Sequence, residues 1–368
     1  MTGKPDQSLT KSDRIVISVD AMGGDAGPAV VVAGLAMSAK KNPQLGFLLH
    51  GPTEELTSLV AKRRILDGRV EIRDAQKVVT MEDKPSQVMR NGKGTSMWST
   101  LDAVKTGEAA GAVSCGNTGA LMALSMLRLR KMPGVNRPAI AILWPSRNPQ
   151  GFNVMLDVGA DVRADARDLL QYALMGTSYV RNSMNIRRPR VGLLNVGTEE
   201  HKGHAELKEA HSLISAQAEK ADYEFVGFVE GSDIPGDAVD LIVTDGFTGN
   251  VAIKTGEGTA SMLRTTLREA FEYSVLSRIA AILAYTSLSR LAKRIDPRRV
   301  NGGVFLGLNG TVVKSHGGAD ATGISAAVKL AFLLAQQGFA EKLAARVASV
   351  VELTQDDADP QDAENPTK

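Results

Sequence analysis

Six loops in this 368-residue chain combine glycine with Asp, Asn, Thr, Lys or His directly after a short apolar run. They are residues 20–25, 114–120, 157–161, 195–203, 245–250 and 314–318. In any single loop of this kind, the polar side chain most often caps the next helix by accepting its unpaired backbone N–H groups. Glycine also lets the backbone approach a ligand closely, and helix N-termini direct N–H groups at anions. Six such loops together predict a site for a small anion such as phosphate.

The elements around these loops alternate between short apolar runs and helical patterns. The runs 15–19, 46–51, 112–114, 153–157, 191–195 and 241–244 are largely apolar, which is typical of strands covered on both faces. This alternation predicts βα units and a three-layer α/β/α fold around a mostly parallel sheet. Ligands bind outside the carboxyl ends of parallel strands, so we expect the six loops to contribute to one site.

The C-terminal part of the chain departs from this alternation. Residues 257–299 carry no strand signal and place apolar residues at helical spacing, which predicts a protruding helical insertion over about 258–300. Residues 304–308 and 311–313 are typical of two strands around a tight Asn309-Gly310 turn. A single final helix is expected over about residues 321–351.

Length and composition favour one large α/β domain over residues 14–353. The polar residues 1–13 and the acidic residues 354–368 are expected to be disordered tails, and no secretion signal is expected. The single cysteine excludes an internal disulfide and fits a reducing cytoplasm. The net charge of +2 is too small to indicate a nucleic-acid partner. No stretch approaches the ~18 consecutive apolar residues of a membrane-spanning helix.

Known nucleotide and hydrolase motifs fit the chain poorly. The first loop, AMGGDAG at 21–27, is not the dinucleotide fingerprint G-x-G-x-x-G. Before Gly92-Lys93, Val88 stands where a phosphate-binding P-loop needs its first glycine. No Ser-His-Asp arrangement accompanies a nucleophile elbow. Hydride transfer and ATP chemistry are therefore weakly supported, and no cofactor is expected.

Taken as a set, the loops resemble those of the phosphate acyltransferase family of bacterial phospholipid synthesis. The matching stretches run from about residue 15 to about 335 and are VDAMGGD (19–25), GNTGA (116–120), RPAI (137–140), LDVGA (156–160), NVGTEEHKG (195–203), TDGFTGNV (244–251), KTGEG (254–258), NGGVFLGLNG (301–310) and KSHG (314–317). Small departures are Cys115 for the usual alanine, Asp161 for a frequent asparagine, and Gly318 for a common serine.

The resemblance implies a fold like that of isocitrate and isopropylmalate dehydrogenases, and a homodimer. It also implies conversion of acyl-acyl carrier protein and inorganic phosphate into acyl phosphate. The next enzyme would be a membrane glycerol-3-phosphate acyltransferase. In this reaction a phosphate oxygen attacks the thioester carbonyl directly, so the protein must hold phosphate and stabilise the tetrahedral oxyanion.

This reaction suggests roles for particular side chains. Lys202 and Lys314 would neutralise phosphate, and His316 would protonate the leaving thiol or orient phosphate. Asn117 and Asn250 would donate hydrogen bonds to the carbonyl oxygen or to phosphate. Further candidates for binding phosphate or substrate are Gly23, Gly24, Asp25, Thr118, Gly119, Asn195, Gly197 and Asp245. We expect Asp25 and Asp245, like Asp20, to brace loops and lysines rather than to touch an anion.

Simpler explanations exist for four of the reactive side chains. His316 is equally explained as a loop-bracing residue. His201 and His204 have the H-x-x-H spacing of a metal site, but solvated residues at a helix start are favoured, and no metal is expected. Cys115 would be an acyl-accepting thiolate in a two-step reaction, but a small buried residue is favoured.

The predicted helical insertion combines an apolar stripe with basic flanks. Residues 262–299 hold eight basic and three acidic side chains. This pattern is typical of a helix lying on anionic lipid, and packing in a dimer or on the core explains it equally. The family resemblance favours a cytoplasmic protein attached peripherally to the membrane through this insertion. Candidate docking patches for the acidic carrier protein are Arg187-Arg188-Arg190, Arg128-Arg130-Lys131 and Arg298-Arg299.

Three alternative functions remain open from the sequence alone. One is a related acyl or phosphoryl transferase that uses acyl-coenzyme A. Another is a non-catalytic, membrane-associated protein that binds the carrier, which the six polar glycine loops disfavour. The last is a dehydrogenase, which lacks its dinucleotide fingerprint.

Overall fold

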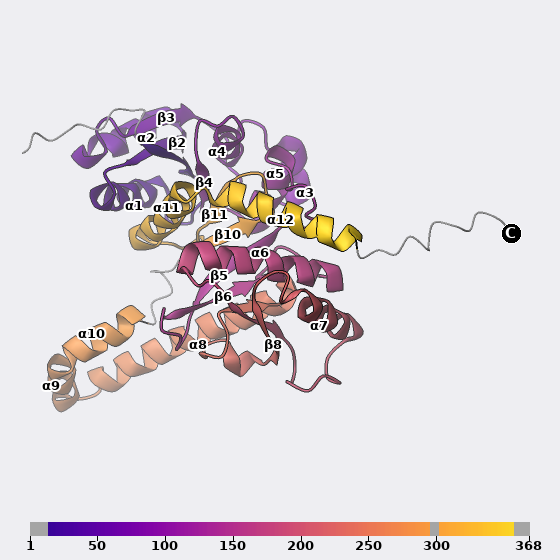
Figure 1. Cartoon of the computed structure of the whole chain (residues 1–368). Coiled ribbons are helices and arrows are strands. Elements are labelled where there is room, and N and C mark those ends of the chain that lie inside the picture. Colours follow the sequence, from indigo (N-terminus) through magenta and orange to yellow (C-terminus); the bar gives the residue numbers. More distant parts are fainter. Residues whose placement is uncertain (1–13, 295–301, 357–368) are drawn as a thin grey trace, which may run out of the picture.

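A computed structural model describes residues 14–294 and 302–356 (Figure 1). The strands are β1 (Ile15–Asp20), β2 (Leu45–Gly51), β3 (Val70–Asp74), β4 (Gly111–Ser114), β5 (Ala139–Pro145), β6 (Phe152–Leu156), β7 (Arg190–Leu194), β8 (Glu224–Val229), β9 (Leu241–Val243), β10 (Gly303–Leu306) and β11 (Thr311–Lys314). The helices are α1 (Pro28–Lys41), α2 (Thr53–Ala61), α3 (Pro85–Asn91), α4 (Ser96–Lys105), α5 (Thr118–Arg128), α6 (Ala166–Met184), α7 (Ala205–Gln217), α8 (Gly246–Glu272), α9 (Val275–Leu283), α10 (Tyr285–Arg294), α11 (Ala321–Gln336) and α12 (Phe339–Asp356).

All eleven strands form one sheet, in the order β3-β2-β1-β4-β11-β10-β5-β6-β9-β7-β8. One face packs against α1, α6 and α11 in a core that includes Leu35, Tyr172 and Val328. The other face packs against α4, α5 and the start of α8 in a core that includes Leu101, Leu121 and Ile253. The expected α/β class, with a mostly parallel sheet between helical layers, is confirmed. The hairpin around Asn309-Gly310 is confirmed as well, as β10 and β11.

The direction of the strands reverses in the middle of the sheet. The pairs β11–β10, β10–β5 and β5–β6 are antiparallel, and the other described neighbours are parallel. The strands β6, β9, β7 and β8 therefore run opposite to β1, β4 and β11. The carboxyl ends of these two groups lie at opposite edges of the sheet, so the expectation that all six loops meet at one edge is wrong.

The final helix is also not continuous. It divides into α11 and α12 at Gly338, whose φ of 60° lies in the left-handed region that glycine adopts without strain. In the part of the chain that the structure describes, no single helix is long and apolar enough to cross a membrane. One bent pair, α11 with the beginning of α12, meets this length and composition test jointly across an angle of 61°.

The expected helical insertion is an outgrowth of the helix that follows β9. Helix α8 begins at Gly246 rather than near residue 258 and continues for 27 residues. Its distal part projects from the body together with α9 and α10 (Figure 1). The proposed division of the chain into one domain and two tails remains a prediction, because residues 1–13 and 357–368 lie outside the described residues.

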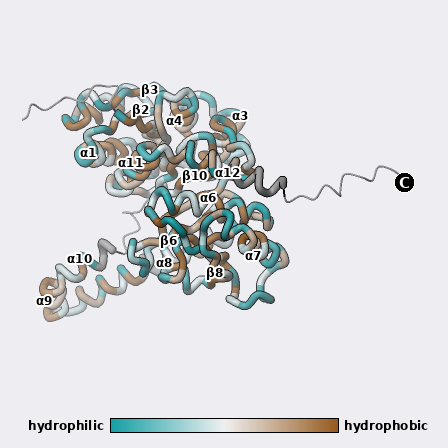
Figure 2. The backbone as a smooth tube through the Cα atoms, viewed as in Figure 1, coloured by the Kyte–Doolittle hydropathy of each residue, from teal (hydrophilic) through white to brown (hydrophobic). Residues whose placement is uncertain are grey.

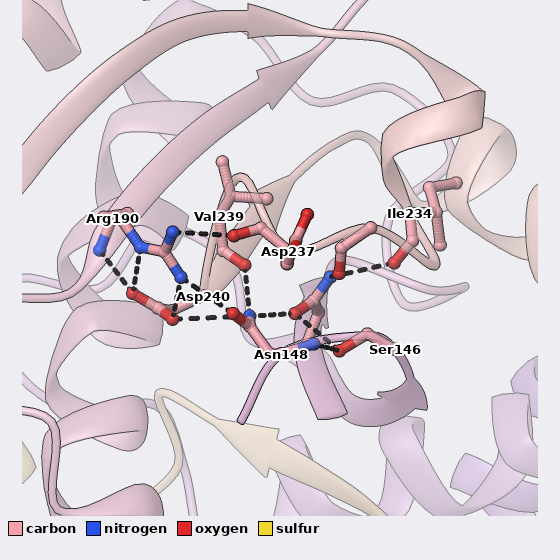
Figure 3. Close-up of polar contacts among 9 residues, drawn as sticks. Ser146, Asn148, Arg190, Ile234, Asp237, Val239 and Asp240 are labelled. Atoms are coloured by element: carbon pink, nitrogen blue, oxygen red, sulfur yellow. Dashed lines mark hydrogen bonds and ion pairs between the residues drawn. The ribbon is translucent and has the colours of Figure 1, made fainter. Parts of the chain in front are cut away.

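A buried polar network fixes the end of β5 and the starts of β6, β7 and β9 (Figure 3). Asp240 accepts hydrogen bonds from the backbone N–H of Arg190 at 2.9 Å and from its guanidinium at 2.8 and 3.1 Å. The same guanidinium donates to Asn148 Oδ1 at 2.8 Å. Asn153 accepts from Ser146 at 3.0 Å and from Asn148. These contacts hold the chain directly after Pro145, where β5 ends.

Loss of the Asp240 charge is predicted to destabilise the fold. Asp240→Asn leaves the guanidinium of Arg190 without its anionic partner at a site where Asp240 is 4% exposed. Because the Arg190 side chain is 33% exposed and keeps its contact with Asn148, we expect a cost of about 1–3 kcal/mol. Urea denaturation should show this loss in the free energy of unfolding. Asp237→Asn is the control, because its side chain is 65% exposed and it should change stability by less than about 0.5 kcal/mol. Equal effects of the two substitutions would contradict the prediction.

Candidate active site

A cavity of about 250 Å³ lies on the sheet face that carries α5 and α8. Its walls come from the ends of β4 and β11, from β5 and the start of β10, and from α8. The lining residues are Thr118, Ile140, Ile142, Leu143, Trp144, Pro145, Val158, Gly159, Asn250, Ile253, Lys254, Glu257, Gly302, Gly303, Lys314, Ser315 and His316. Four of the residues predicted from the sequence thus lie around one space: Thr118, Asn250, Lys314 and His316.

The loops after β1, β4 and β11 interlock beside this cavity through glycines. A side chain on Gly23 would place its Cβ 2.7 Å from the backbone nitrogen of Gly116. One on Gly24 would approach the carbonyl oxygen of Gly317 to 3.3 Å. The backbone N–H of Asp25 donates to that same carbonyl at 3.0 Å. The paired glycines therefore serve to bring three strand ends into contact.

Asp20 stabilises this glycine turn through hydrogen bonds. Its carboxylate accepts from the Ser114 hydroxyl at 2.7 Å and from the backbone N–H of Met22 at 3.1 Å, and the residue is 1% exposed. Burial raises the pKa of Asp20, and hydrogen bonds from Ser96, Ser114 and Met22 act in the opposite direction. The acid is directed into the loops and not into the cavity, as expected from the sequence.

Lys314 is a partly buried cation at the end of β11. Its ammonium donates to the carbonyl oxygen of Cys115 at 3.3 Å and to that of Ser315. Burial lowers the pKa of Lys314 to about 8. Lys254 contributes to this lowering, whereas Cys115, Asp25 and Asp20 act in the opposite direction. The ammonium is therefore charged below about pH 8 and loses its charge above it.

The ring of His316 has a defined orientation. Its Nδ1 accepts a hydrogen bond from the backbone N–H of Gly318 at 3.2 Å. A ring nitrogen that accepts carries no proton, so the proton of the neutral ring is on Nε2. His316 is thus braced by its loop and also lines the cavity, which joins the two interpretations drawn from the sequence.

Helix α8 supplies the facing wall. Asp245 caps its N-terminus by accepting from the backbone N–H of Thr248 at 2.9 Å. Asn250 uses one N–H of its amide to bind the carbonyl oxygen of Val158 at 3.2 Å. Lys254 pairs with Glu257 at 2.8 Å, and both line the cavity. We missed Lys254 as a site residue, although its i,i+4 spacing from Asn250 places both on one helical face once the start of α8 is known.

One buried carboxylate organises the loop after β6. Asp157 is fully buried and accepts from the backbone N–H groups of residues 140, 158, 159, 160 and 161. Burial raises the pKa of Asp157, and these N–H groups act against that effect. The start of α8 packs tightly on this loop, because a Cβ on Gly249 would lie 2.0 Å from the carbonyl oxygen of Asp157. The wall formed by β5, the loop and α8 is therefore one connected unit.

Other predicted site residues lie around the cavity without lining it. Asn117 caps α5 by accepting from the backbone N–H of Ala120, and its amide donates to the carbonyl oxygens of Met81 and Asp83. Gly119 lies in the first turn of α5, where a Cβ would be 2.9 Å from Pro85.

The loop after β7 holds Lys202, Asn195 and Gly197 and does not line the cavity. Lys202 pairs with Glu199 at 2.9 Å, and Asn195 donates to the carbonyl oxygen of Lys202 at 3.2 Å. The reversal of strand direction explains this placement, because β7 ends at the sheet edge opposite to β11. Their roles in binding phosphate remain predictions.

The structure favours the simpler explanation for Cys115. The residue is 2% exposed and is not among the cavity-lining residues. Burial raises the pKa of its thiol to about 11, which keeps it protonated and weakly nucleophilic near pH 7. His204 stands at the N-cap of α7. Among the described residues, no group of three His, Cys, Asp or Glu side chains is placed to hold a metal ion.

Comparisons with known proteins decide the family. A family model described as fatty acid synthesis protein matches residues 15–342. A phosphate acyltransferase from Ruegeria sp. (strain TM1040) is 82% identical over 366 residues, covering 100% of this chain and 98% of that protein. One from Ruegeria pomeroyi is 77% identical over 364 residues, covering 99% and 98%. The chain belongs to the phosphate acyltransferase family. It is therefore an acyltransferase, and its substrates are phosphate and an acyl donor.

Solved structures with low sequence identity share the fold of this acyltransferase. A phosphotransacetylase from Streptococcus pyogenes has a TM-score of 0.58 at 19% identity, covering 89% of this chain and 94% of that one. The EutD phosphotransacetylase from Staphylococcus aureus has a TM-score of 0.54 at 17% identity, covering 88% and 94%. At these identities the likeness extends to the fold alone.

The pKa of Lys314 predicts how phosphate use depends on pH. The ratio kcat/KM for phosphate should fall as pH rises through about 8, because the free enzyme then loses the charge of Lys314. Lys314→Gln should lower this ratio about tenfold to hundredfold near pH 7 and remove that alkaline decline. Steady-state rates between about pH 6 and pH 9.5 test both. The same decline in wild type and Lys314→Gln would assign it to another group.

Proposed function

We propose that this acyltransferase moves a fatty acyl group from acyl-acyl carrier protein to inorganic phosphate, giving acyl phosphate for phospholipid synthesis. The observation that carries the proposal is the single cavity that brings Lys314, His316, Asn250 and Thr118 together in a member of the phosphate acyltransferase family. It offers a cation, hydrogen-bond donors and an imidazole ring beside an apolar wall. No cofactor enters the proposed reaction.

Phosphate binding is assigned to the wall formed by β4 and β11. The ammonium of Lys314, the hydroxyl of Thr118 and the N-terminal turn of α5 supply positive charge and donors there. Gly23, Gly24 and Asp25 support this wall from outside the cavity. Asn117 fixes the position of α5 relative to residues 81–83 through its hydrogen bonds. Asp245 similarly positions α8 by capping its first turn.

The reaction joins one phosphate oxygen to the thioester carbonyl carbon. The carbon–oxygen bond forms, the carbonyl oxygen carries the negative charge of the tetrahedral intermediate, and the carbon–sulfur bond then breaks with its electron pair on sulfur. The second N–H of the Asn250 amide stabilises the oxyanion. The Nε2–H of His316 donates a hydrogen bond to the departing sulfur, and the proton that hydrogen phosphate gives up goes to the thiolate, so acyl phosphate and a thiol are formed. No covalent acyl-enzyme is needed, because phosphate is itself an anionic nucleophile.

Phosphate-dependent release of thiol from acyl-acyl carrier protein tests the function. Wild-type enzyme should release thiol only with phosphate present and should form acyl phosphate in equal amount. His316→Ala should lower kcat about hundredfold, since it removes the hydrogen-bond donor to the departing sulfur. His204→Ala is the matched control, because His204 lies at the N-cap of α7 and does not line the cavity, so its rate should be unchanged.

Three results would contradict parts of this proposal. Release without phosphate would exclude the acyl-phosphate reaction. Turnover of acyl-coenzyme A but not of the carrier-bound substrate would assign the donor to the coenzyme. Carrier binding with neither reaction would indicate a non-catalytic binding protein.

Attachment to a membrane is proposed for the projecting helices, and the same surface is the alternative dimer interface. Tyr273, Leu276, Ile282 and Leu283 are between 74% and 89% exposed. Figure 2 shows hydrophobic residues concentrated around α9 at the tip of the projection. Arg264, Arg268, Arg278 and Arg290 lie on the same three helices. Exposed apolar side chains beside arginines support binding to anionic lipid. In this proposal the protein is a cytoplasmic homodimer that lies on the membrane. It would there be close to the membrane glycerol-3-phosphate acyltransferase that would use its product.

The arginine patches considered for carrier docking are partly used within the fold. Arg190 is held by Asp240, Arg188 pairs with Glu219 at 2.5 Å, and Arg128 pairs with Asp102 and stacks 4.5 Å from the Trp98 ring. Residues 298–299 lie outside the described residues. Docking of the carrier therefore remains a prediction without a preferred patch.

Replacement of the tip residues tests the membrane proposal. The double variant Ile282→Ser, Leu283→Ser should weaken binding to phosphatidylglycerol vesicles at least about tenfold, because each buried aliphatic side chain contributes about 1.5–3 kcal/mol. Vesicle sedimentation measures this, and salt should weaken the wild-type binding. Ile65→Ser is the control, since Ile65 is 42% exposed but lies on another surface. A variant that becomes monomeric without losing vesicle binding would identify the tip as the dimer interface.

A further inference from the structure

The cavity has two walls of different chemistry. The wall at the ends of β4 and β11 is polar and holds Thr118, Lys314 and His316. The wall at β5 is apolar and holds Ile140, Ile142 and Trp144, and α8 adds Ile253 beside the polar Asn250, Lys254 and Glu257. In the sheet, Lys314 pairs with Gly303 of β10, and the next pair, Val304 with Ala141, leads to β5. The two walls are thus separated by two strand spacings, about 10 Å.

The apolar wall follows from the side-chain alternation of β5. Residues 140, 142 and 144 point to one face because successive strand residues alternate. All three line the cavity. Ile142 and Trp144 are only partly buried, so their apolar surfaces are not fully covered by the protein itself.

The position of the Trp144 ring depends on a glycine in α8. A Cβ at Gly256 would lie 2.6 Å from both Cζ2 and Cη2 of this indole, which is closer than carbon atoms approach. Gly249, two turns earlier on the same helical face, likewise meets the loop after β6. Helix α8 therefore lies so close to β5 that any side chain at residue 256 must displace the indole.

We propose that the apolar side chains of β5, together with Ile253 of α8, hold the acyl chain of the donor, and that Trp144, which packs against Gly256, determines which chain lengths are accepted. This inference rests on the proposed function for the identity of the occupant. Both walls line the same cavity, so a carbonyl carbon placed between them has its chain on the apolar side. A cavity of about 150 Å³ already binds benzene, and this one is larger.

The chain-length preference of three variants tests the proposal. Burial of each methylene strengthens binding about fourfold, so Trp144→Ala should lower the kcat/KM ratio of hexadecanoyl to octanoyl donor at least about tenfold. Gly256→Ala should shift the same ratio by displacing the indole. The KM for phosphate should stay within about twofold in both. Trp98→Leu is the matched control, because Trp98 is the only other tryptophan of the chain and does not line the cavity.

A binding measurement separates this inference from the proposed function. In Trp98→Phe, Trp144 is the only tryptophan, and brominated dodecanoate should quench its fluorescence by contact. Gly256→Ala in that background should weaken the quenching. The reciprocal variant Trp144→Phe, which retains Trp98, should show little quenching at the same concentrations.

The outcomes are distinguishable. Quenching of Trp144 without any phosphate-dependent turnover would support the apolar subsite while rejecting the proposed function. Normal phosphate-dependent turnover, with no quenching and an unchanged chain-length ratio in Trp144→Ala, would overturn the subsite while leaving the function intact. Equal quenching of Trp98 and Trp144 would also overturn it.

Discussion

The arrangement of the site depends on the antiparallel strands β10 and β5 at the centre of the sheet. In a fully parallel sheet, all strand-end loops would share one edge and a ligand would lie outside it. Here the direction changes across β11, β10, β5 and β6, so each half of the sheet presents its loops at a different edge. A site built from both halves must then lie on the face of the central strands. Helix α8 makes this possible by starting at the far edge and returning across that face.

The return of α8 requires an unusually close approach between helix and sheet. Gly246 and Gly249 lie against the loop after β6, where Asp157 collects five backbone N–H groups that would otherwise be buried without partners. The cost of burying this carboxylate is offset by those hydrogen bonds. The same contact fixes the position of Asn250, which directly follows Gly249, so packing of the helix start against the loop sets the position of a polar side chain at the cavity.

The sequence predicts local features well and long-range geometry poorly. Apolar runs, the Asn309-Gly310 turn and capping residues such as Asp245 act over a few residues, and they form as expected. The direction of β6 relative to β11 depends on pairings between residues far apart in the chain, which no local pattern encodes. The sequence therefore places Lys202 and Lys314 in one phosphate site because both are lysines in glycine-rich loops. In the structure, these two loops lie at opposite edges of the sheet. Lys254 was missed for a related reason, since its helical face is defined only once α8 is known to begin at Gly246.

The electrostatics of Lys314 explain why acids stand so near a site for an anion. A buried ammonium is costly, and Asp20 and Asp25 reduce that cost by supplying negative potential. Their position behind the Gly23-Gly24 turn keeps them out of the cavity, and Asp20 is held there by Ser114. Lys254 has the opposite effect, because its positive charge lowers the pKa of Lys314. In the proposed reaction, phosphate bound beside Lys314 would favour the charged form of its ammonium, while Lys254 stays paired with Glu257 on the facing wall.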